Sequence, residues 1–225
     1  MFERIEFFRE KDREEFEKYR KLKGTALFDH IYSLLTESGE TVKYGHFNSH
    51  IRYDKHLREK LYNYMATVEE YFRAQIVERF DVAIPKKYRS HCFKQLKEDL
   101  IPRSGDRSVL YYGFQPDFGD LMHICAEKEI CDISSSDQKA IKDLRNDTMH
   151  HSLIMFGVAK TKAELLEHFS VLERQLNAFC RALPQEYQKG FLSDMEALNA
   201  TGDRNRKHLD KYYLEVQDGT IRIKT

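Results

Sequence analysis

Apolar residues recur every three or four positions along most of the chain, which is the spacing that lines one face of an α-helix. The strongest pattern runs from about residue 54 to residue 80. A second pattern, over 161–183, is almost a heptad seam, built from Leu165, Phe169, Leu172, Leu176, Phe179 and Leu183. Shorter patterns predict helices over 2–23, 26–36, about 91–100, 118–129 and from 134 to about 151. The chain is therefore predicted to be an all-α bundle.

The expected connections carry the residues that end helices and form turns. Gly24 and Gly39 follow the first two patterns, "VKYGHFNSH" is expected to be a connection, and "IPRSGDRSVLYYGFQPD" is the longest expected loop. The serines at 134–136 supply an N-cap, Ser135 with Gln138 fits a capping box, and Thr161 with Glu164 forms a second box. In "YYLEVQDGTIRIKT" an Asp-Gly pair separates two β-branched or aromatic runs, which predicts a small C-terminal β-hairpin.

Composition narrows the class of protein. The 225 residues include 37 basic and 37 acidic side chains, so a strongly basic surface for nucleic acid is excluded, although a local basic patch is not. No apolar run approaches the roughly 20 residues that cross a bilayer. The four cysteines (Cys92, Cys125, Cys131 and Cys180) are scattered, which indicates reduced thiols that pack as small hydrophobic residues. We therefore expect a cytoplasmic protein without membrane association.

The segment "IKDLRNDTMHHS" combines an arginine, an asparagine and two adjacent histidines. Asn146 and His150 share a helical face, whereas Arg145 and His150 are about 140° apart, a gap that a long arginine side chain partly bridges. Metal-free RNA cleavage needs a base for the 2′-hydroxyl, an acid for the departing 5′-oxygen and a cation for the phosphate. Histidine and arginine supply these functions. Because one histidine cannot easily make both proton transfers, a dimer that apposes two copies of this helix is expected.

Three ordered blocks resemble the HEPN ribonucleases. Arg145-Asn146-x-x-x-His150 looks like the R-polar-x-x-x-H signature of that superfamily, and "LRNDTMHHS" is similar to the "RNxxxHHS" segment of its abortive-infection-like (Abi-like) bacterial branch. "IRYDKHLREKLYNYMATVEEYFRAQIVERF" resembles that branch's long helix, which opens with an aromatic-Asp-x-x-Leu-Arg pattern. "YGFQPDFGDLMHI" resembles its Phe-Gly-x-Leu helix start. The resemblance covers roughly residues 51–156.

The resemblance implies a HEPN-like helical bundle that forms a homodimer and cleaves RNA without a metal or other cofactor, leaving 2′,3′-cyclic phosphate ends. It implies that Arg145 holds the scissile phosphate, that His150 transfers protons and that Asn146 orients the histidine or the phosphate. The expected role is that of a toxin or antiphage effector, for which a protein or RNA antitoxin is plausible. The expected division is N-terminal helices over 1–50, the HEPN-like core over 51–185 and an extension with the hairpin over 186–225.

Two positions depart from the family pattern. Residues 153–155 are Leu-Ile-Met where the branch commonly has an arginine and an aromatic residue, so one RNA contact is expected to be missing. Ser152 occupies the position at which a HEPN subgroup carries a modified tyrosine, so that form of control is not expected.

Less specific interpretations remain for each of these residues. Arg145 and Asn146 also fit a solvated helix face paired with Asp143 or Asp147. The altered residues after "HHS" and the neutral overall charge motivate a second hypothesis, a non-catalytic HEPN module that binds RNA or a protein partner. His151 is expected at the helix end or in packing, with RNA contact as the alternative. In the long loop, Tyr111 and Tyr112 are flanked by Arg103 and Arg107, and two interpretations stay open: the tyrosines stack on RNA bases, or they pin the loop to the bundle. The histidines of "GHFNSHIRYDKH" (His46, His50 and His56) lack an evident third metal ligand and are interpreted as surface residues, with no metal site expected.

Overall fold

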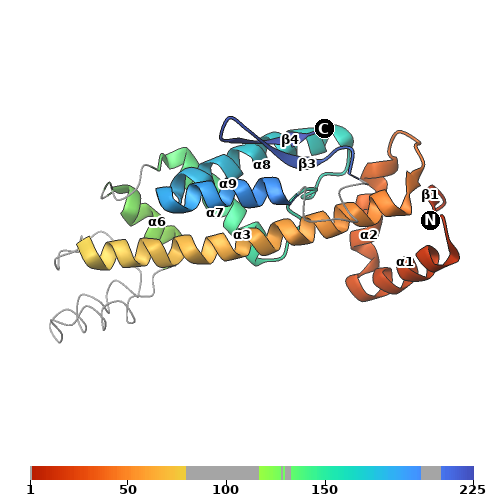
Figure 1. Ribbon diagram of the computed structural model, residues 1–225, viewed down its shortest axis with the longest axis horizontal. Coiled ribbons are helices and arrows are strands. Elements are labelled where there is room, and N and C mark those ends of the chain that lie inside the picture. The colour runs from red at the N-terminus through yellow and green to blue at the C-terminus, as the bar shows by residue number, and fades with distance from the viewer. Residues whose placement is uncertain (1, 80–116, 128, 130–132, 199–208) are drawn as a thin grey trace.

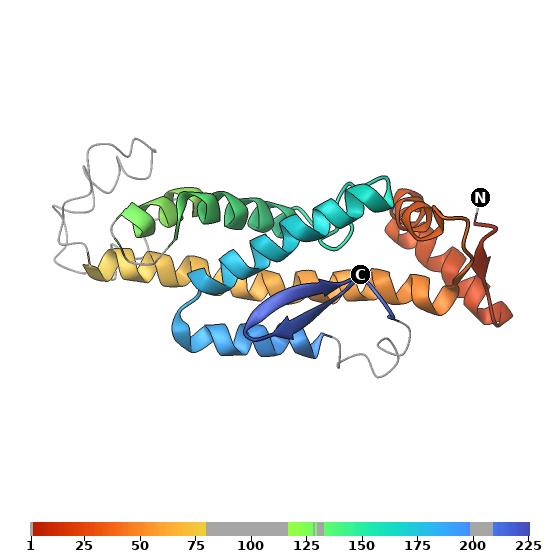
Figure 2. The same cartoon turned by 90° about the horizontal axis from the view of Figure 1, so that it is seen from above.

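One long helix, α3 (Tyr44–Arg79), runs along the molecule, and the other helices lie against it or at its ends (Figure 1). The computed structural model describes residues 2–79, 117–127, 129, 133–198 and 209–225. Beside α3 lie α6 (Phe118–Glu127), α7 (Ser135–Met149), α8 (Lys162–Ala182) and α9 (Gln185–Ala197), as Figure 2 shows from above. The fold is all-α with a small C-terminal hairpin, as the sequence predicts.

The buried face of α3 explains why it is the central helix. Five side chains spaced by three or four residues have no exposed surface: Leu57, Leu61, Met65, Val68 and Phe72. Burying a large apolar side chain contributes about 1.5–3 kcal/mol, so this row stabilises the helix far more than its local propensity does.

The α8 stripe is part of the same core. All six predicted positions (Leu165, Phe169, Leu172, Leu176, Phe179 and Leu183) are buried within the chain. The helix begins after Thr161, whose hydroxyl accepts a hydrogen bond from the Glu164 N–H at 3.2 Å. The stripe is therefore bundle core and leaves no free heptad seam for a second copy.

The N-terminal part differs from the expected single helix over 2–23. Residues Ile5–Glu6 form strand β1, which pairs in parallel with β2 (Val42–Lys43), and helix α1 begins only at Glu10 and ends at Lys23. Helix α2 (Thr25–Thr36) follows after Gly24, whose φ of 97° suits glycine. A cluster of aromatic rings joins these elements to the start of α3: Phe2, Phe7, Phe16, Phe28, Tyr44 and Phe47.

The prediction that "VKYGHFNSH" is a connection was wrong. Val42–Lys43 is a strand and the rest of this segment is the first two turns of α3. Tyr44, Phe47 and Ile51 are buried on one helical face against the N-terminal rings. Their burial outweighs the weak helix propensity of the glycine, asparagine and serine between them. Helix α3 also crosses residue 50, where the sequence suggested a domain boundary.

Helix α9 (Gln185–Ala197) was not predicted, whereas the other helix boundaries lie close to the predicted ones. Ser134, rather than Ser135, caps α7: its hydroxyl accepts a hydrogen bond from the Asp137 N–H at 3.1 Å. The predicted hairpin is confirmed as β3 (Tyr213–Gln217) and β4 (Thr220–Lys224). Its backbone is tied to the bundle, since the Leu214 N–H donates to the Tyr53 hydroxyl at 2.8 Å.

Some predictions lie outside the described residues. These are the helix expected near 91–100 and most of the long loop over 101–117, with Arg103, Arg107, Tyr111 and Tyr112, as well as Cys92 and Cys131. Cys125 and Cys180 are buried thiols that form no disulfide among the described residues. Within the part of the chain that the structure describes, no helix is both long enough and apolar enough to cross a membrane.

Candidate functional site

The three residues of the predicted motif lie at the C-terminal end of α7. The opposite face of the helix is fixed in the core by Leu144 and Thr148, and the Thr148 hydroxyl donates to the Leu144 carbonyl oxygen at 2.8 Å. Arg145 and Asn146 therefore remain partly exposed, and His150, the residue that caps the helix, is exposed. The Asn146 carbonyl oxygen accepts the His150 N–H at 2.9 Å, so the motif is continuous through its backbone.

Arg145 is oriented by α3 and α6 rather than by its neighbours in sequence. Its Nη2 lies 4.0 Å from Oε2 of Glu69, and its guanidinium carbon lies 5.9 Å from the ring centre of Phe118. The expected partners Asp143 and Asp147 do not form this ion pair. Glu69 also binds Arg73, at 3.4 Å, so one carboxylate serves two cations. At 4.0 Å the pair orients Arg145 without a short hydrogen bond to Glu69, and since Nε of Arg145 is buried, the terminal Nη groups are the donors that a phosphate could reach.

His151 adopts a backbone conformation that usually belongs to glycine. The Ser152 N–H donates to the Asp147 carbonyl at 2.9 Å and the His151 N–H to the Thr148 carbonyl at 3.3 Å, the two bonds of a Schellman helix end. In this motif the residue at position 151 is left-handed, and His151 has a φ of 58°. The end of α7 therefore holds a histidine where glycine would be less strained. Burial raises the pKa of Asp147, against the opposing effects of nearby His168 and a hydrogen bond from Ser152.

An acidic and a basic residue of α3 fasten the segment that follows the histidines. Arg58 donates from Nη1 to the His151 carbonyl oxygen at 3.0 Å, and its Nε lies 2.9 Å from Oδ2 of Asp54. Asp54 is fully buried, and its Oδ1 accepts the Met155 N–H at 2.8 Å. Burial raises the pKa of Asp54, while the Met155 N–H and Arg58 act in the opposite direction. We name this arrangement of Asp54 and Arg58 the α3 clamp.

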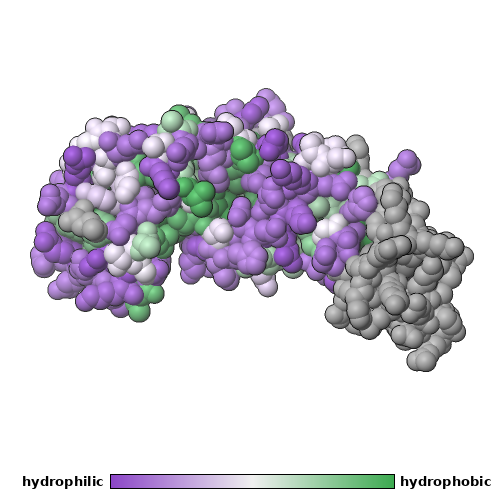
Figure 3. Space-filling view, turned by 180° about the vertical axis from the view of Figure 1, so that it is seen from behind, coloured by the Kyte–Doolittle hydropathy of each residue, from purple (hydrophilic) through white to green (hydrophobic). Residues whose placement is uncertain are grey.

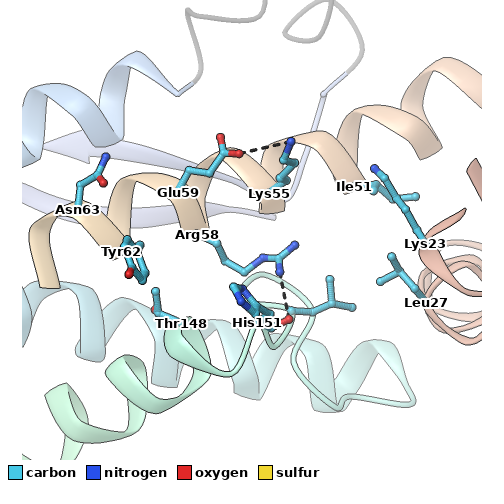
Figure 4. Close-up of a pocket in the computed structure, with 11 residues that line it drawn as sticks. Lys23, Leu27, Ile51, Lys55, Arg58, Glu59, Tyr62, Asn63, Thr148 and His151 are labelled. Atoms are coloured by element: carbon cyan, nitrogen blue, oxygen red, sulfur yellow. Dashed lines mark hydrogen bonds and ion pairs between the residues drawn. The ribbon is translucent and has the colours of Figure 1, made fainter. Parts of the chain in front are cut away.

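A groove of about 970 Å³ opens beside His151. On the face opposite to that of Figure 1, hydrophobic side chains gather between the N-terminal helices and the bundle (Figure 3). Lys23 and Leu27 border the groove from α1 and α2, α3 forms its long wall, and His151 lies beside Arg58 (Figure 4). Its lining comprises Lys23, Leu27, Ile51, Lys55, Arg58, Glu59, Tyr62, Asn63, Thr148, His151 and Leu153. Three of these lining residues are cations (Lys23, Lys55 and Arg58) and one is a carboxylate (Glu59), while three are aliphatic. The groove can therefore accommodate an anion that also has an apolar portion.

A smaller recess of about 340 Å³ continues along α3. It is lined by Tyr62, Ala66, Glu69, Glu70, Arg73 and Met149. Tyr62 lines both cavities, and 51% of its surface is exposed. The two cavities therefore adjoin at Tyr62: Lys23 borders the groove, and Glu69, which pairs with Arg145, borders the recess. We call the two cavities together the path along α3.

The structure brings some of the predicted residues together and keeps others apart. His151 borders the groove, whereas His150 is absent from its lining, so the two adjacent histidines serve different surfaces. No hydrogen bond or ion pair joins Arg145 to His150 in the described part of the chain.

The histidines considered for a metal have other surroundings. His50 is buried edge-on to Phe156, its ring centre 5.6 Å away, and was wrongly interpreted as a surface residue. His56 lies 3.1 Å from Glu59. Among the described residues, no three His, Cys, Asp or Glu side chains are grouped so that they could hold a metal ion.

The sequence did not single out Asp54, Arg58 or Lys23 as site residues. Asp54 and Arg58 belong to the aromatic-Asp-x-x-Leu-Arg block of the long helix, and that block was the available signal. Arg58 meets His151 across 93 residues of chain, a contact that no local pattern reveals. Lys23 lies outside the resembling region altogether.

Comparison with known proteins adds no relative. No family model, no curated protein and no solved structure matches the chain. Membership of the HEPN superfamily therefore stays a prediction from the three sequence blocks.

Proposed function

We propose that the protein is a metal-independent endoribonuclease of the HEPN type that acts as a toxin or antiphage effector. One observation carries the proposal: the end of α7 presents a partly exposed arginine and two exposed histidines, and one of these histidines, His151, borders a groove that contains three further cations. A polyanion with a reactive phosphate is the substrate class that this arrangement fits.

The proposed reaction is an attack of the 2′-hydroxyl on the adjacent phosphorus. A base takes the 2′-hydroxyl proton, the bond from O2′ to phosphorus forms and the bond from phosphorus to O5′ breaks. An acid then gives a proton to O5′. His150 is the proton-transfer group, and Arg145 stabilises the charge on the phosphate oxygens. Glu69 positions Arg145, and the partly exposed Asn146 is available to orient the histidine or the phosphate.

A second histidine is needed if both proton transfers occur together. His151 borders the groove and His150 does not, so the two histidines of one chain face different surfaces. In this proposal the second proton-transfer group is therefore His150 of another copy. The expected assembly is therefore a homodimer. A sedimentation mass equal to the 26.8 kDa chain at micromolar concentration, with cleavage intact, would exclude the shared site.

The decisive experiment compares wild type and His150→Ala on labelled total RNA in EDTA, with mapping of the new ends. His56→Ala is the matched control, because it removes an exposed histidine of α3 outside the groove lining. We expect cyclic-phosphate ends from wild type and His56→Ala only. Equal cleavage by His150→Ala would refute the assigned role, and inhibition of all three proteins by EDTA would refute the metal-free mechanism.

A non-catalytic module that binds RNA or a protein partner is the second candidate. The ion pair of Arg145 with Glu69 favours it, because a structural arginine would be held in the same way. RNA affinity that survives His150→Ala, together with an inactive wild type, would support this function. An antitoxin, whether protein or RNA, belongs to the toxin proposal, and co-expression that relieves toxicity would identify one.

A further inference from the structure

We propose that the groove and the recess along α3 hold a single-stranded segment of RNA, with phosphates against Lys23, Lys55 and Arg58 and a base on Tyr62. This inference rests on the proposed function and names the surface that carries the substrate beside its scissile phosphate. It assigns a substrate-binding task to the N-terminal helices, which the family resemblance does not cover.

The first argument is the charge balance of the groove. Among its lining residues, Glu59 is the one acidic side chain, and it lies 3.4 Å from Lys55 and 3.1 Å from His56. Lys23 has no carboxylate partner among the described residues. Its pKa is lowered by partial burial and by the positive charges of Lys55, Arg52 and Arg58. A phosphate would relieve this crowding of cations, which is the electrostatic complement that RNA supplies.

The second argument is the fixed position of Arg58. Its Nε faces Asp54 and its Nη1 donates to the His151 carbonyl, so the guanidinium is held at two points. Only 22% of its side chain is exposed, and it borders the groove. A planar, pre-oriented guanidinium loses little freedom when a phosphate binds. Arg58 therefore places a backbone phosphate next to the end of α7.

The third argument is the distribution of apolar and aromatic surface. Leu27, Ile51 and Leu153 provide apolar surface within the groove, and the half-exposed ring of Tyr62 lies where groove and recess meet. A basic groove with an accessible aromatic ring is the arrangement by which proteins bind unpaired bases. In an A-form duplex the bases are stacked and paired, so Tyr62 would meet only backbone. The strand in this groove is therefore single.

The fourth argument is the continuity of the path with the proposed catalytic residues. From Tyr62 the recess leads to Arg73 and Glu69, and Glu69 holds Arg145. With Glu69 and Glu70 against the single cation Arg73, the lining of this recess carries a net negative charge, unlike that of the groove. Tight phosphate binding is thus expected on the Lys23 side, while the Arg145 side holds the phosphate that reacts.

Binding can be measured apart from cleavage with a fluorescent single-stranded 2′-O-methyl RNA, which lacks the attacking hydroxyl. We expect Lys23→Gln to weaken binding and to lower the slope of log affinity against log salt by about 0.7, the value for one lost phosphate contact in a single strand. Lys21→Gln is the control, because it removes an exposed lysine of the same helix that does not line the groove. Tyr62→Ala should weaken binding by about 5- to 150-fold, the loss of one stacked base.

Three results would overturn the inference: equal effects of Lys23→Gln and Lys21→Gln, equal affinity for a 2′-O-methyl duplex, or a change in sedimentation mass caused by Tyr62→Ala. The last result would make the path an interface between copies. Thermal unfolding of each variant checks that the fold is retained. Groove-dependent binding without cleavage of ordinary RNA supports this inference and rejects the catalytic proposal. Cleavage that is unchanged by Lys23→Gln and Tyr62→Ala supports the catalytic proposal and rejects this inference.

Discussion

The Arg58 guanidinium donates a hydrogen bond to the His151 carbonyl oxygen, at 3.0 Å and across 93 residues of chain. This contact fixes the end of α7 relative to α3. It depends in turn on Asp54, which is buried and binds both Arg58 and the Met155 N–H. The position of the end of α7 relative to α3 thus depends on the ion pair between Asp54 and Arg58.

Arg58→Met is expected to lower the free energy of unfolding by about 3 kcal/mol, because it leaves the buried Asp54 carboxylate without its cation. Adding Asp54→Asn removes that charge, so the double variant should be less destabilised than the sum of the two single variants. Urea unfolding of the four proteins measures the difference. Strict additivity would show that the α3 clamp is not a coupled pair.

His151→Gly should raise stability and reduce function. Glycine adopts the left-handed conformation of position 151 without strain, so the free energy of unfolding should increase by about 1 kcal/mol. The imidazole that borders the groove is lost, so affinity for single-stranded RNA should fall. Urea unfolding and RNA binding on the same sample test both effects, and a gain in stability with unchanged affinity would make His151 purely structural.

Glu69→Gln should distinguish the orientation of Arg145, which affects kcat, from the binding of RNA, which affects KM. The variant removes the carboxylate that lies 4.0 Å from Arg145, so kcat for RNA cleavage should drop by about ten-fold or more as the guanidinium loses its orientation. Loss of a negative charge from the recess should leave KM unchanged or lower it. Glu70→Gln makes the same charge change one residue further along, and an equal loss of kcat in both variants would argue against a specific role for Glu69.

Stability should decline in mild acid because of His50. Burial lowers the pKa of this histidine to about 3, while nearby Asp210 acts in the opposite direction. The unfolded chain binds a proton at His50 below its ordinary pKa of about 6.5, whereas the folded chain does so only near 3. The free energy of unfolding should therefore fall by about 1.4 kcal/mol per pH unit between these values, or about 2 kcal/mol from pH 6.5 to 5.

The matched variant is His50→Phe, which keeps an aromatic ring against Phe156 and Tyr212. Its stability should lose the slope of about 1.4 kcal/mol per pH unit that His50 contributes. Parallel pH profiles for the two proteins would show that another group causes the acid sensitivity.

Periodic apolar patterns sufficed to predict most of the helices that build the bundle, but α9 (Gln185–Ala197) was not predicted. The α8 stripe and the C-terminal hairpin follow from residue spacing and from the Asp-Gly turn, which are local properties. The start of α3 was missed because Tyr44 and Phe47 become helical through burial against Phe16 and Phe28, which lie far away in sequence.

The site was predictable only in part for the same physical reason. Arg145, Asn146 and His150 stand together in one short segment, so their placement at a helix end could be expected. Glu69, Arg58 and Lys23 reach the site through tertiary packing, and the left-handed backbone of His151 has no signal in residue type. The spacing suggested that Arg145 partly bridges the gap to His150, but no hydrogen bond or ion pair joins the two side chains in the described part of the chain.

The N-terminal aromatic cluster has a consequence for how this surface can change. Lys23 and Leu27 lie on α1 and α2, which pack on the start of α3 through the rings of Phe16, Phe28 and Phe47. One border of the groove is thus formed by the N-terminal helices, whose outer residues can be substituted while Arg145 and His150 stay in place. Under the proposed function, exchange of these helices between related chains would be a route to new RNA preferences with unchanged chemistry.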